Sequence, residues 1–243
     1  MVWQGASLWL LAAQNDTAGT DFHSHHAVQI TLSLAGDFAL RTQQLSARGP
    51  IAAVAADIRH TFEATGAVAF LFIEPESGAG RTLAERLFAT SDMVEIDAGP
   101  FAPIQAALRT SLGTDCSDHE LVGIGQALLE QIAGQLAPPP VNPRVQAMID
   151  YIRANLDGPM TLGAAANRAA LSPSRARHLF AQATGLSFKS FVLWQRLERA
   201  VEFYAAGHSL TQAAHAAGFS DSAHLSRTFR KTFGIPASML EVS

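Results

Sequence analysis

The strongest constraint on the fold is a repeat in the last third of the chain. Residues 161–170 and 210–217 each have the pattern of a short helix, followed by a tight turn and a second helix, at 174–184 and 221–233. The ten residues that end at Phe180 parallel the eleven that end at Phe229, and the two segments start about 48 residues apart. The repeat predicts two helix-turn-helix units in one polypeptide.

A longer helix is expected between the two units. Residues 187–206 have a helical pattern of about 20 residues, which corresponds to a length of about 30 Å. Successive major-groove faces of B-DNA recur at about 34–36 Å. One chain is therefore predicted to place the second helix of each unit in adjacent grooves, even without a dimer.

Charge is distributed unevenly along the 243 residues, whose formal net charge is −4. Residues 1–140 hold 6 Lys and Arg against 15 Asp and Glu, a net charge of −9, whereas residues 141–243 hold 11 against 6, a net charge of +5. A basic module beside an acidic one is typical of a polyanion-binding domain joined to a sensing or assembly domain. Solvated surface charge is the alternative interpretation.

The repeat lies within a longer set of motif residues. The set comprises Thr161-Leu162, Leu171-Ser172-Pro173-Ser174, Leu179-Phe180, Thr184-Gly185-Leu186-Ser187-Phe188, Arg196-Leu197, Ala200, Ala214, Ala217-Gly218-Phe219-Ser220-Asp221 and Phe229-Arg230-Lys231-Thr232-Phe233-Gly234-Ile235-Pro236. With these residues, positions 145–240 resemble the DNA-binding domain of the AraC/XylS family of regulators. The chain departs from the family pattern at Ala170, which replaces a turn glycine, at Ala165 and Ala213 in the core, and at Met239-Leu240.

The resemblance implies sequence-specific binding to double-stranded DNA, with RNA polymerase as a further partner. By position in the family's motif, the expected DNA-binding residues are Ser174, Arg175, Arg177 and His178 in the first unit, Ser222, Ala223, Ser226 and Arg227 in the second, and Lys189, Arg230 and Lys231 at phosphates. Arg177 and Arg227 are the strongest candidates for direct readout, because arginine binds guanine in a bidentate manner. Leu179, Phe180, Leu225 and Phe229 are assigned to the core.

The N-terminal part has the pattern of a small β domain followed by helices. Short apolar runs at 7–11, 27–34, 37–41, 51–55 and 67–73 are separated by turn residues, which indicates an antiparallel sandwich or barrel. Amphipathic helices are expected at 83–90, 102–112 and 119–135, either covering the sheet or pairing with a second copy. The resulting expectation is an α+β chain with an effector or dimerisation domain at 1–137, a proline-rich linker at 138–143 and a DNA-binding domain at 144–243.

Histidines mark the first domain. His23 and His25 share one face of an extended segment, Gln29 follows, and His60 lies eleven residues after Gly49. This pattern resembles the two cupin motifs, with Gln29 in place of the metal-binding Glu and with Ala55, Asp57 and Ala64 departing from the second motif. The resemblance implies a jelly-roll barrel, which AraC-type regulators commonly carry as their effector domain.

The histidines leave three interpretations open. His23, His25, Gln29 and His60 form a candidate site for a divalent metal such as Zn, Ni, Fe or Cu, which the loss of the Glu charge weakens. Alternatively, Phe22 and these four residues line a small-molecule pocket, with Phe38, Phe62 and Phe72 as further walls. In the third interpretation they are hydrogen-bonded residues of a packed barrel.

The leading functional hypothesis is a cytoplasmic transcription regulator, an activator in its family's pattern, which forms a homodimer and responds to a small molecule or metal. The single cysteine, the lack of a signal-peptide pattern and the absence of a membrane-spanning apolar run favour the cytoplasm, with no membrane partner. We do not expect an enzyme. The alternatives are a metal-dependent cupin enzyme fused to a DNA-binding domain and a ligand-independent DNA-binding dimer.

Overall fold

The computed structural model describes the chain except for residues 4, 13–17, 115, 135–140 and 238–243. It divides into two compact units, one of residues 1–139 with 231–235 and the other of residues 140–230 with 236–243. The N-terminal part is rich in strands and the C-terminal part is helical, which confirms the two-domain α+β class. Residues 138–140 of the predicted linker lie outside the described residues, and its last residue, Pro143, begins a helix.

Among the described residues, the first unit contains two antiparallel sheets. The larger sheet has the strand order β1 (Val2–Trp3), β2 (Ala6–Ala12), β9 (Ala67–Ile73), β4 (Val28–Ala35), β7 (Ile51–Val54) and β10 (Met93–Glu95). The smaller sheet has the order β3 (Ala18–Gly19), β8 (Thr61–Ala64), β5 (Phe38–Arg41) and β6 (Ser46–Arg48). The five longer predicted strands are confirmed as β2, β4, β5, β7 and β9.

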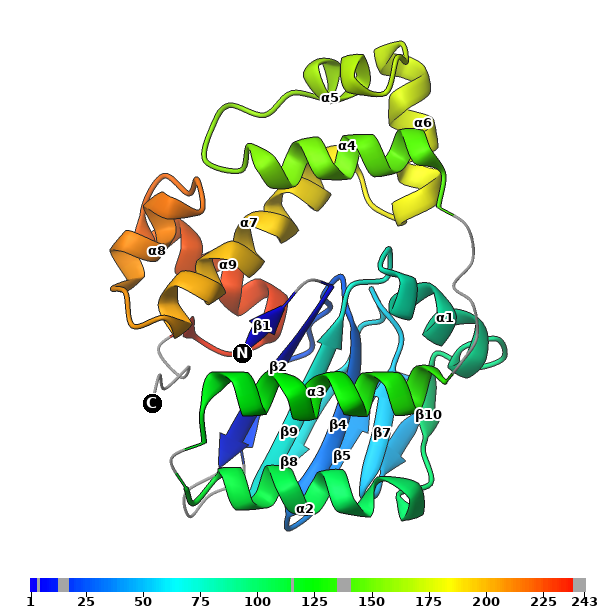
Figure 1. Ribbon diagram of the computed structural model, residues 1–243, viewed down its shortest axis with the longest axis vertical. Helices are drawn as coiled ribbons and strands as arrows, with labels where there is room; N and C mark the ends of the chain where they lie inside the picture. Colours follow the sequence, from blue (N-terminus) through cyan, green and yellow to red (C-terminus); the bar gives the residue numbers. More distant parts are fainter. Residues whose placement is uncertain (4, 13–17, 115, 135–140, 238–243) are drawn as a thin grey trace. The chain divides into compact units, whose positions relative to one another are not determined.

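Helices α1 (Gly78–Leu87), α2 (Ala102–Ser111) and α3 (Asp118–Ala133) belong to the same unit, with the short helix η1 (Gly99–Phe101) before α2. Figure 1 shows α2 and α3 lying across the larger sheet. Ile30 and Leu32 of β4 share one apolar cluster with Leu108 of α2 and Leu128 of α3. The predicted helical cover of the sheet is therefore observed.

The opposite face of β4 explains why polar groups are buried here. Side chains alternate along a strand, so Gln29 and Thr31 point away from the helices that Ile30 and Leu32 contact. Gln29 is 2% exposed and Thr31 is fully buried. A second apolar cluster, which includes Phe38 and Phe62, joins residues from both sheets. The unit is thus a helix layer on a two-sheet sandwich, with polar side chains on an inner face.

The predicted closed barrel is not observed, because the described strands form two separate sheets. The outermost strands β1, β10, β3 and β6 have only two or three residues each. Such short strands offer few ladder hydrogen bonds with which to join one sheet to the other. The jelly-roll connectivity stays a prediction.

One helix boundary also differs from the prediction. Helix α1 begins at Gly78, five residues before the predicted start at 83. The Ser77 hydroxyl accepts a hydrogen bond from the Gly80 amide at 2.9 Å, which caps the first turn. The small residues of this turn hid the helix, because they add nothing to an apolar repeat.

The second unit follows the expected order of helices. These are α4 (Pro143–Ala154), α5 (Leu162–Arg168), α6 (Pro173–Thr184), α7 (Phe188–Ala205), α8 (Leu210–Ala216) and α9 (Ser222–Phe233). The predicted caps are present: Thr161 accepts from the Ala164 amide at 3.2 Å and Ser172 from the Arg175 amide at 3.4 Å. The 18 residues of α7 extend about 27 Å.

Both turns of the repeat have the same backbone geometry. The Leu171 amide donates to the Ala166 carbonyl at 3.0 Å, and the Phe219 amide donates to the Ala214 carbonyl at 2.9 Å. In each case the chain leaves the helix through a left-handed residue, Ala170 at φ +51° and Gly218 at φ +78°. This conformation costs a residue other than glycine about 1–2 kcal/mol, so the first turn is strained.

We expect Ala170→Gly to stabilise the protein. The substitution removes the left-handed strain, although glycine's greater freedom in the unfolded chain offsets part of the gain, leaving about 0.5–1 kcal/mol. Urea denaturation measures the difference. In the control Ala164→Gly, glycine replaces a residue within α5 and should lower the unfolding free energy by about 1 kcal/mol. Destabilisation by Ala170→Gly would contradict the role of strain.

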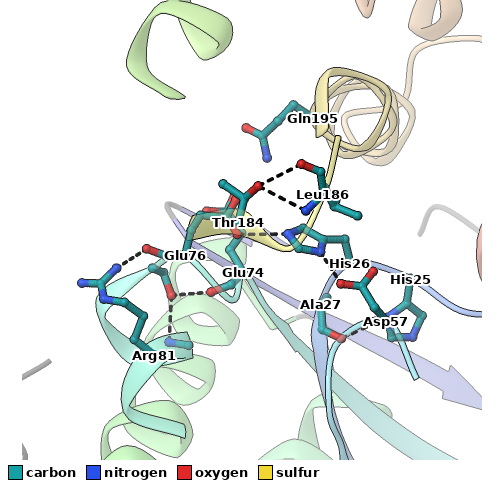
Figure 2. Close-up of polar contacts among 12 residues, drawn as sticks. His25, His26, Ala27, Asp57, Glu74, Glu76, Arg81, Thr184, Leu186 and Gln195 are labelled. Carbon is teal, nitrogen blue, oxygen red and sulfur yellow. Dashed lines mark hydrogen bonds and ion pairs between the residues drawn. The ribbon is translucent and has the colours of Figure 1, made fainter. Parts of the chain in front are cut away.

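A buried ionic cluster joins two loops of the first unit. Figure 2 shows His26 directed toward the Asp57 carboxylate, with Nδ1 at 2.8 Å from Oδ2, and Nε2 lies 3.3 Å from an oxygen of Glu76. Burial alone would lower the pKa of His26, but the Asp57 and Glu76 carboxylates reverse this and raise its pKa to about 9. Protonated His26 therefore ties the loop after β7 to the segment before α1.

The stabilisation from His26 should depend on pH. It is complete below about pH 6.5, the ordinary pKa of histidine, and is lost as pH rises through about 9. We expect His26→Gln to lower the unfolding free energy by about 2–4 kcal/mol near pH 6, because a buried carboxylate loses its charged partner. Above pH 9 the loss should be much smaller, because His26 is then neutral in the wild type as well. His119→Gln, at an exposed position of α3, is the control. A difference that does not change with pH would refute the ionic role.

Candidate nucleic-acid interface and histidine cluster

Helix α6 is the second helix of the first helix-turn-helix unit, and it presents the predicted DNA-binding residues of that helix-turn-helix unit on its surface. Ser174, Arg177 and His178 are exposed, and their spacing of three and four residues places them on one face of the helix. On the inner face, Ala176 and Phe180 are fully buried. The exposed face thus offers hydroxyl, guanidinium and imidazole groups, each able to hydrogen-bond to a base edge or a phosphate. Arg175 is exposed as well.

Helix α9 has the same division between an inner and an outer face. Leu225 and Phe229 are buried, while Ala223, Arg227 and Arg230 are exposed. The half-buried Ser222 and Ser226 border this surface, and Lys231 is exposed near the helix end. The Asp221 carboxylate accepts a hydrogen bond from the His224 amide at 2.6 Å and so begins the helix at the turn.

Two further positions, on α7 and α6, belong to the exposed polar surface of the C-terminal compact unit. Lys189 is exposed in the first turn of α7, after the Ser187 hydroxyl that accepts from the Ser190 amide at 3.2 Å. Gln182 is exposed one turn after His178 on α6 and was missed by the sequence prediction. Its spacing of four residues from His178 was the available signal. The DNA contacts of all these residues stay predictions.

The histidines of the first unit come together through backbone pairing. His23 donates its amide to the His60 carbonyl at 3.0 Å, and His60 donates to the His23 carbonyl at 2.9 Å. His25 follows two residues after His23, and the three ring centroids lie 4.4–5.6 Å apart. One ring nitrogen of each histidine lies within 4.8 Å of those of the other two. All three side chains and Gln29 are buried.

The predicted aromatic walls are only partly brought to this cluster. Phe72 lies edge-on to His25, with ring centroids 5.1 Å apart. Phe22 is 44% exposed and lies under the Arg59 guanidinium at 5.7 Å, so it is not buried with the histidines. Phe38 and Phe62 belong to the apolar cluster shared by the two sheets.

Backbone carbonyls fix the tautomer of each histidine. The Nδ1 atoms of His23, His25 and His60 lie 2.9, 3.1 and 2.8 Å from the carbonyl oxygens of Asp21, Ala27 and Ile58 respectively. A carbonyl oxygen can only accept, so each Nδ1 carries the proton. In a neutral imidazole, Nε2 then has an unshared electron pair.

The side chain of Gln29 meets two of these electron pairs. Its Oε1 lies 3.0 Å from Nε2 of His25 and 3.3 Å from Nε2 of His60, while its Nε2 donates to the Thr31 hydroxyl at 3.0 Å. Protonated imidazoles would donate to Oε1, but burial and the neighbouring imidazoles lower the pKa of His25 well below its usual value and that of His60 to about 4. At neutral pH three acceptors therefore face one another.

Two arrangements resolve this juxtaposition of acceptors. In the first, the side-chain amide of Gln29 is flipped by 180°, so that its NH2 group donates to the imidazoles. In the second, a cation lies among the electron pairs. The residues fit a divalent metal, because three neutral imidazoles suit Zn, Ni, Cu or Fe. Their Nδ1–H groups already donate to backbone carbonyls, which is how proteins orient metal-binding histidines. His23, His25 and His60 would hold such a metal, with Gln29 Oε1 as a fourth donor.

Comparison with known proteins concerns first the second unit. A family model described as a helix-turn-helix domain matches residues 165–241. The transcriptional activator NphR of a Rhodococcus species is 31% identical over 164 residues, which cover 67% of this chain and 46% of NphR. The arabinose operon regulatory protein of Salmonella typhimurium is 32% identical over 117 residues, covering 46% of this chain and 42% of that protein.

Solved structures show a similar fold along the chain. ToxT from Vibrio cholerae O395 has a TM-score of 0.62 at 12% identity and matches 98% of each chain. Another ToxT structure, from strain SCE256, is described as bound to an unsaturated fatty acid, with a TM-score of 0.59 at 10% identity and coverage of 98% of this chain and 95% of that chain. None of the helices in the described residues is long and apolar enough to cross a membrane.

The chain spans less than half the length of the two curated relatives that it matches. The match to the helix-turn-helix model falls on the two helix-turn-helix units of the repeat. The paired turns and the long helix between them give that match a structural basis. Residues 165–241 therefore form a helix-turn-helix domain similar to that of the AraC/XylS family of transcriptional regulators.

Proposed function

We propose that this chain is a sequence-specific DNA-binding transcription regulator, and an activator like the NphR relative. The observation that carries the proposal is the pair of helices α6 and α9, each with a buried apolar face and an exposed polar and basic face. Both follow the same kind of turn, in a region whose net charge is +5 over residues 141–243. A basic surface supplies the salt-dependent attraction to phosphates that DNA binding requires.

Within this function, side chains have different roles. Arg177 and Arg227 read bases, since each is exposed on the outer face of its helix and can contact guanine with two hydrogen bonds. Ser174, His178, Ser222, Ala223 and Ser226 border them, and Arg175, Lys189, Arg230 and Lys231 contact phosphates. Phosphate contacts position the protein but carry no sequence information directly.

The role of Arg227 can be tested by substitution. We expect Arg227→Ala to weaken binding to the preferred site by about 1–3 kcal/mol and to relax the preference at one base pair. Selection of binding sites from random duplexes with wild-type protein identifies the preferred site, and fluorescence anisotropy then measures affinity for that site and for its single-base variants.

Lys231→Ala is the matched comparison. It should weaken binding to all sequences by a similar factor and reduce the salt dependence of affinity, because it removes a phosphate contact. Equal losses on preferred and random DNA for Arg227→Ala would exclude direct readout by that residue. A wild-type protein that selects no sequence would overturn the proposed function.

The first unit is proposed to control this activity. The buried polar groups on the inner face of its sandwich are suited to a small ligand or metal, and ToxT, which shares the fold, has been solved with an unsaturated fatty acid bound. A ligand changes DNA binding only if its affinity differs between two conformations of the protein. We also propose that the sandwich is cupin-like. Its role is regulatory and not enzymatic, and this role depends on a bound ligand.

We also propose the partners, the cellular location and the oligomeric state of this regulator. RNA polymerase is the expected partner of an activator, and the cytoplasm, where the chromosome lies, is the expected location. We propose a homodimer, which sedimentation of the full chain would detect. The domain limits of 1–137, 138–143 and 144–243 remain those predicted from the sequence.

A further inference from the structure

The histidine cluster has one property that distinguishes it from a set of packed polar residues: each ring is held at Nδ1 by a backbone carbonyl, and ring nitrogens of all three histidines lie within 4.8 Å of one another. We propose that His23, His25, His60 and Gln29 form a divalent transition-metal centre that binds a small carboxylate anion as an additional ligand. The inference rests on the proposed function in one respect, because the carboxylate would be the effector of the regulator.

The spacing of the donor atoms supports a metal centre. Donors about 2.1 Å from a metal lie about 3.0 Å apart at right angles and about 3.4 Å apart in a tetrahedron. Gln29 Oε1 lies 3.0 and 3.3 Å from Nε2 of His25 and His60, which falls in this interval. A ring nitrogen of His23 lies within 4.8 Å of ring nitrogens of His25 and His60. The distances from Gln29 Oε1 suit a hydrogen bond from a rotated amide, and they equally suit Gln29 as a metal ligand.

The fixed tautomers provide an independent argument. Metal-bound imidazoles must offer an unshared pair, and three backbone carbonyls already hold the Nδ1 protons on the opposite side of the rings. The imidazoles therefore present their Nε2 electron pairs without a change of tautomer. A packed histidine needs only one such bond, whereas three histidines held in the same way, with ring nitrogens within 4.8 Å of one another, favour a common ligand.

Charge explains why an anion is needed. A divalent ion held by three imidazoles and an amide retains its full double charge, because none of these donors is anionic. Among the described residues, the cluster of metal-binding groups contains no carboxylate. The nearby Asp57 and Glu76 are paired with His26, and Asp21, whose charge acts on His23, is not a member of that cluster. An uncompensated ion in a buried site is costly, so the centre should attract an anion from solution.

The class of anion follows from the chemistry of the site. Three-histidine zinc sites keep a position open for water or substrate and can expand to five ligands. A carboxylate supplies the charge that a glutamate would have supplied at position 29, and it places an organic group beside the Phe72 ring, which lies 5.1 Å from that of His25. With Gln in place of Glu the ligand set lacks a negative charge, and an external carboxylate at the open position would supply it.

Cobalt provides a spectroscopic test on the full chain. Protein depleted of metal with a chelator is titrated with Co²⁺, and sodium acetate is then added as the carboxylate probe. We expect one Co²⁺ per chain, with visible absorption, and a saturable change of that absorption on addition of acetate. An unchanged spectrum would overturn the binding of a carboxylate, and the absence of Co²⁺ binding would overturn the centre.

Variants separate the two parts of the proposal. Gln29→Glu should bind Co²⁺ at least about tenfold more tightly, because it adds a charged ligand, and should lose the response to acetate. His60→Ala should weaken Co²⁺ binding by at least about tenfold, and the exposed His119→Ala should not change it. Circular dichroism verifies folding, and if His60→Ala is unfolded, Gln29→Glu alone decides. A Gln29→Glu protein that responds to acetate like the wild type would refute the charge argument.

DNA binding is measured separately, so that the two proposals can fail independently. Anisotropy on the selected site, with Co²⁺ present and with or without acetate, should show a change of affinity in the wild type and none in Gln29→Glu. If acetate binds to the metal but leaves DNA affinity unchanged, the carboxylate is not an effector. If the protein binds no specific DNA while the spectroscopic changes occur, the regulator is wrong and the metal centre is supported.

Discussion

Helix α7 is the element on which the second unit depends, because its side chains enter the cores of both helix-turn-helix units. Near its start, Phe191 and Val192 pack into the cluster formed with α4, α5 and α6. Farther along, Leu197, Ala200 and Val201 are buried where α7 packs against α8. A continuous helix with fixed faces cannot rotate one unit without disturbing the other. The spacing of α6 and α9 is therefore set by the length and the apolar pattern of a single helix.

Arg196 reinforces this coupling from the side of α7. Its guanidinium donates to the Leu156 carbonyl at 3.1 Å and to the Gly158 carbonyl at 3.0 Å, at the end of the first helix of the unit. A side chain at Gly218 would meet the same Leu156 carbonyl at 2.5 Å, so the second turn packs closely against the Arg196 link. Glycine at the second turn is thus required for space as well as conformation. In the first turn Ala170 shows that the conformation alone can be imposed by packing.

The sequence predicted the second unit well because its signals are local. Helix caps such as Thr161 and Ser172, the turn residues and the apolar periodicity all lie within a few residues of the structure that they specify. The first unit was predicted less completely, since its short edge strands have too few residues for a pattern. The pairing of His26 with Asp57 and Glu76 could not be foreseen, because it joins residues 31 and 50 positions apart. The exposure of Phe22 could not be foreseen either, because it depends on how its segment packs in the fold.

The candidate metal site was predicted in its members but not in its chemistry. Sequence spacing brought His23, His25, Gln29 and His60 into one hypothesis, whereas the protons on the ring nitrogens depend on carbonyl groups whose positions only the fold defines. Those protons decide whether the cluster is a hydrogen-bonded network or a set of electron-pair donors.

The two halves of the repeat differ in the residues that face outward, whereas both inner faces are apolar. Phe180 and Phe229 occupy equivalent buried positions, yet the outer face of α6 carries Arg177 and His178 where α9 carries Ser226 and Arg227. Because different side chains favour different base edges, the two units should not read the same sequence. With their separation fixed by α7, a single chain would recognise an asymmetric site, and any symmetry in the operator would have to come from a second copy of the chain.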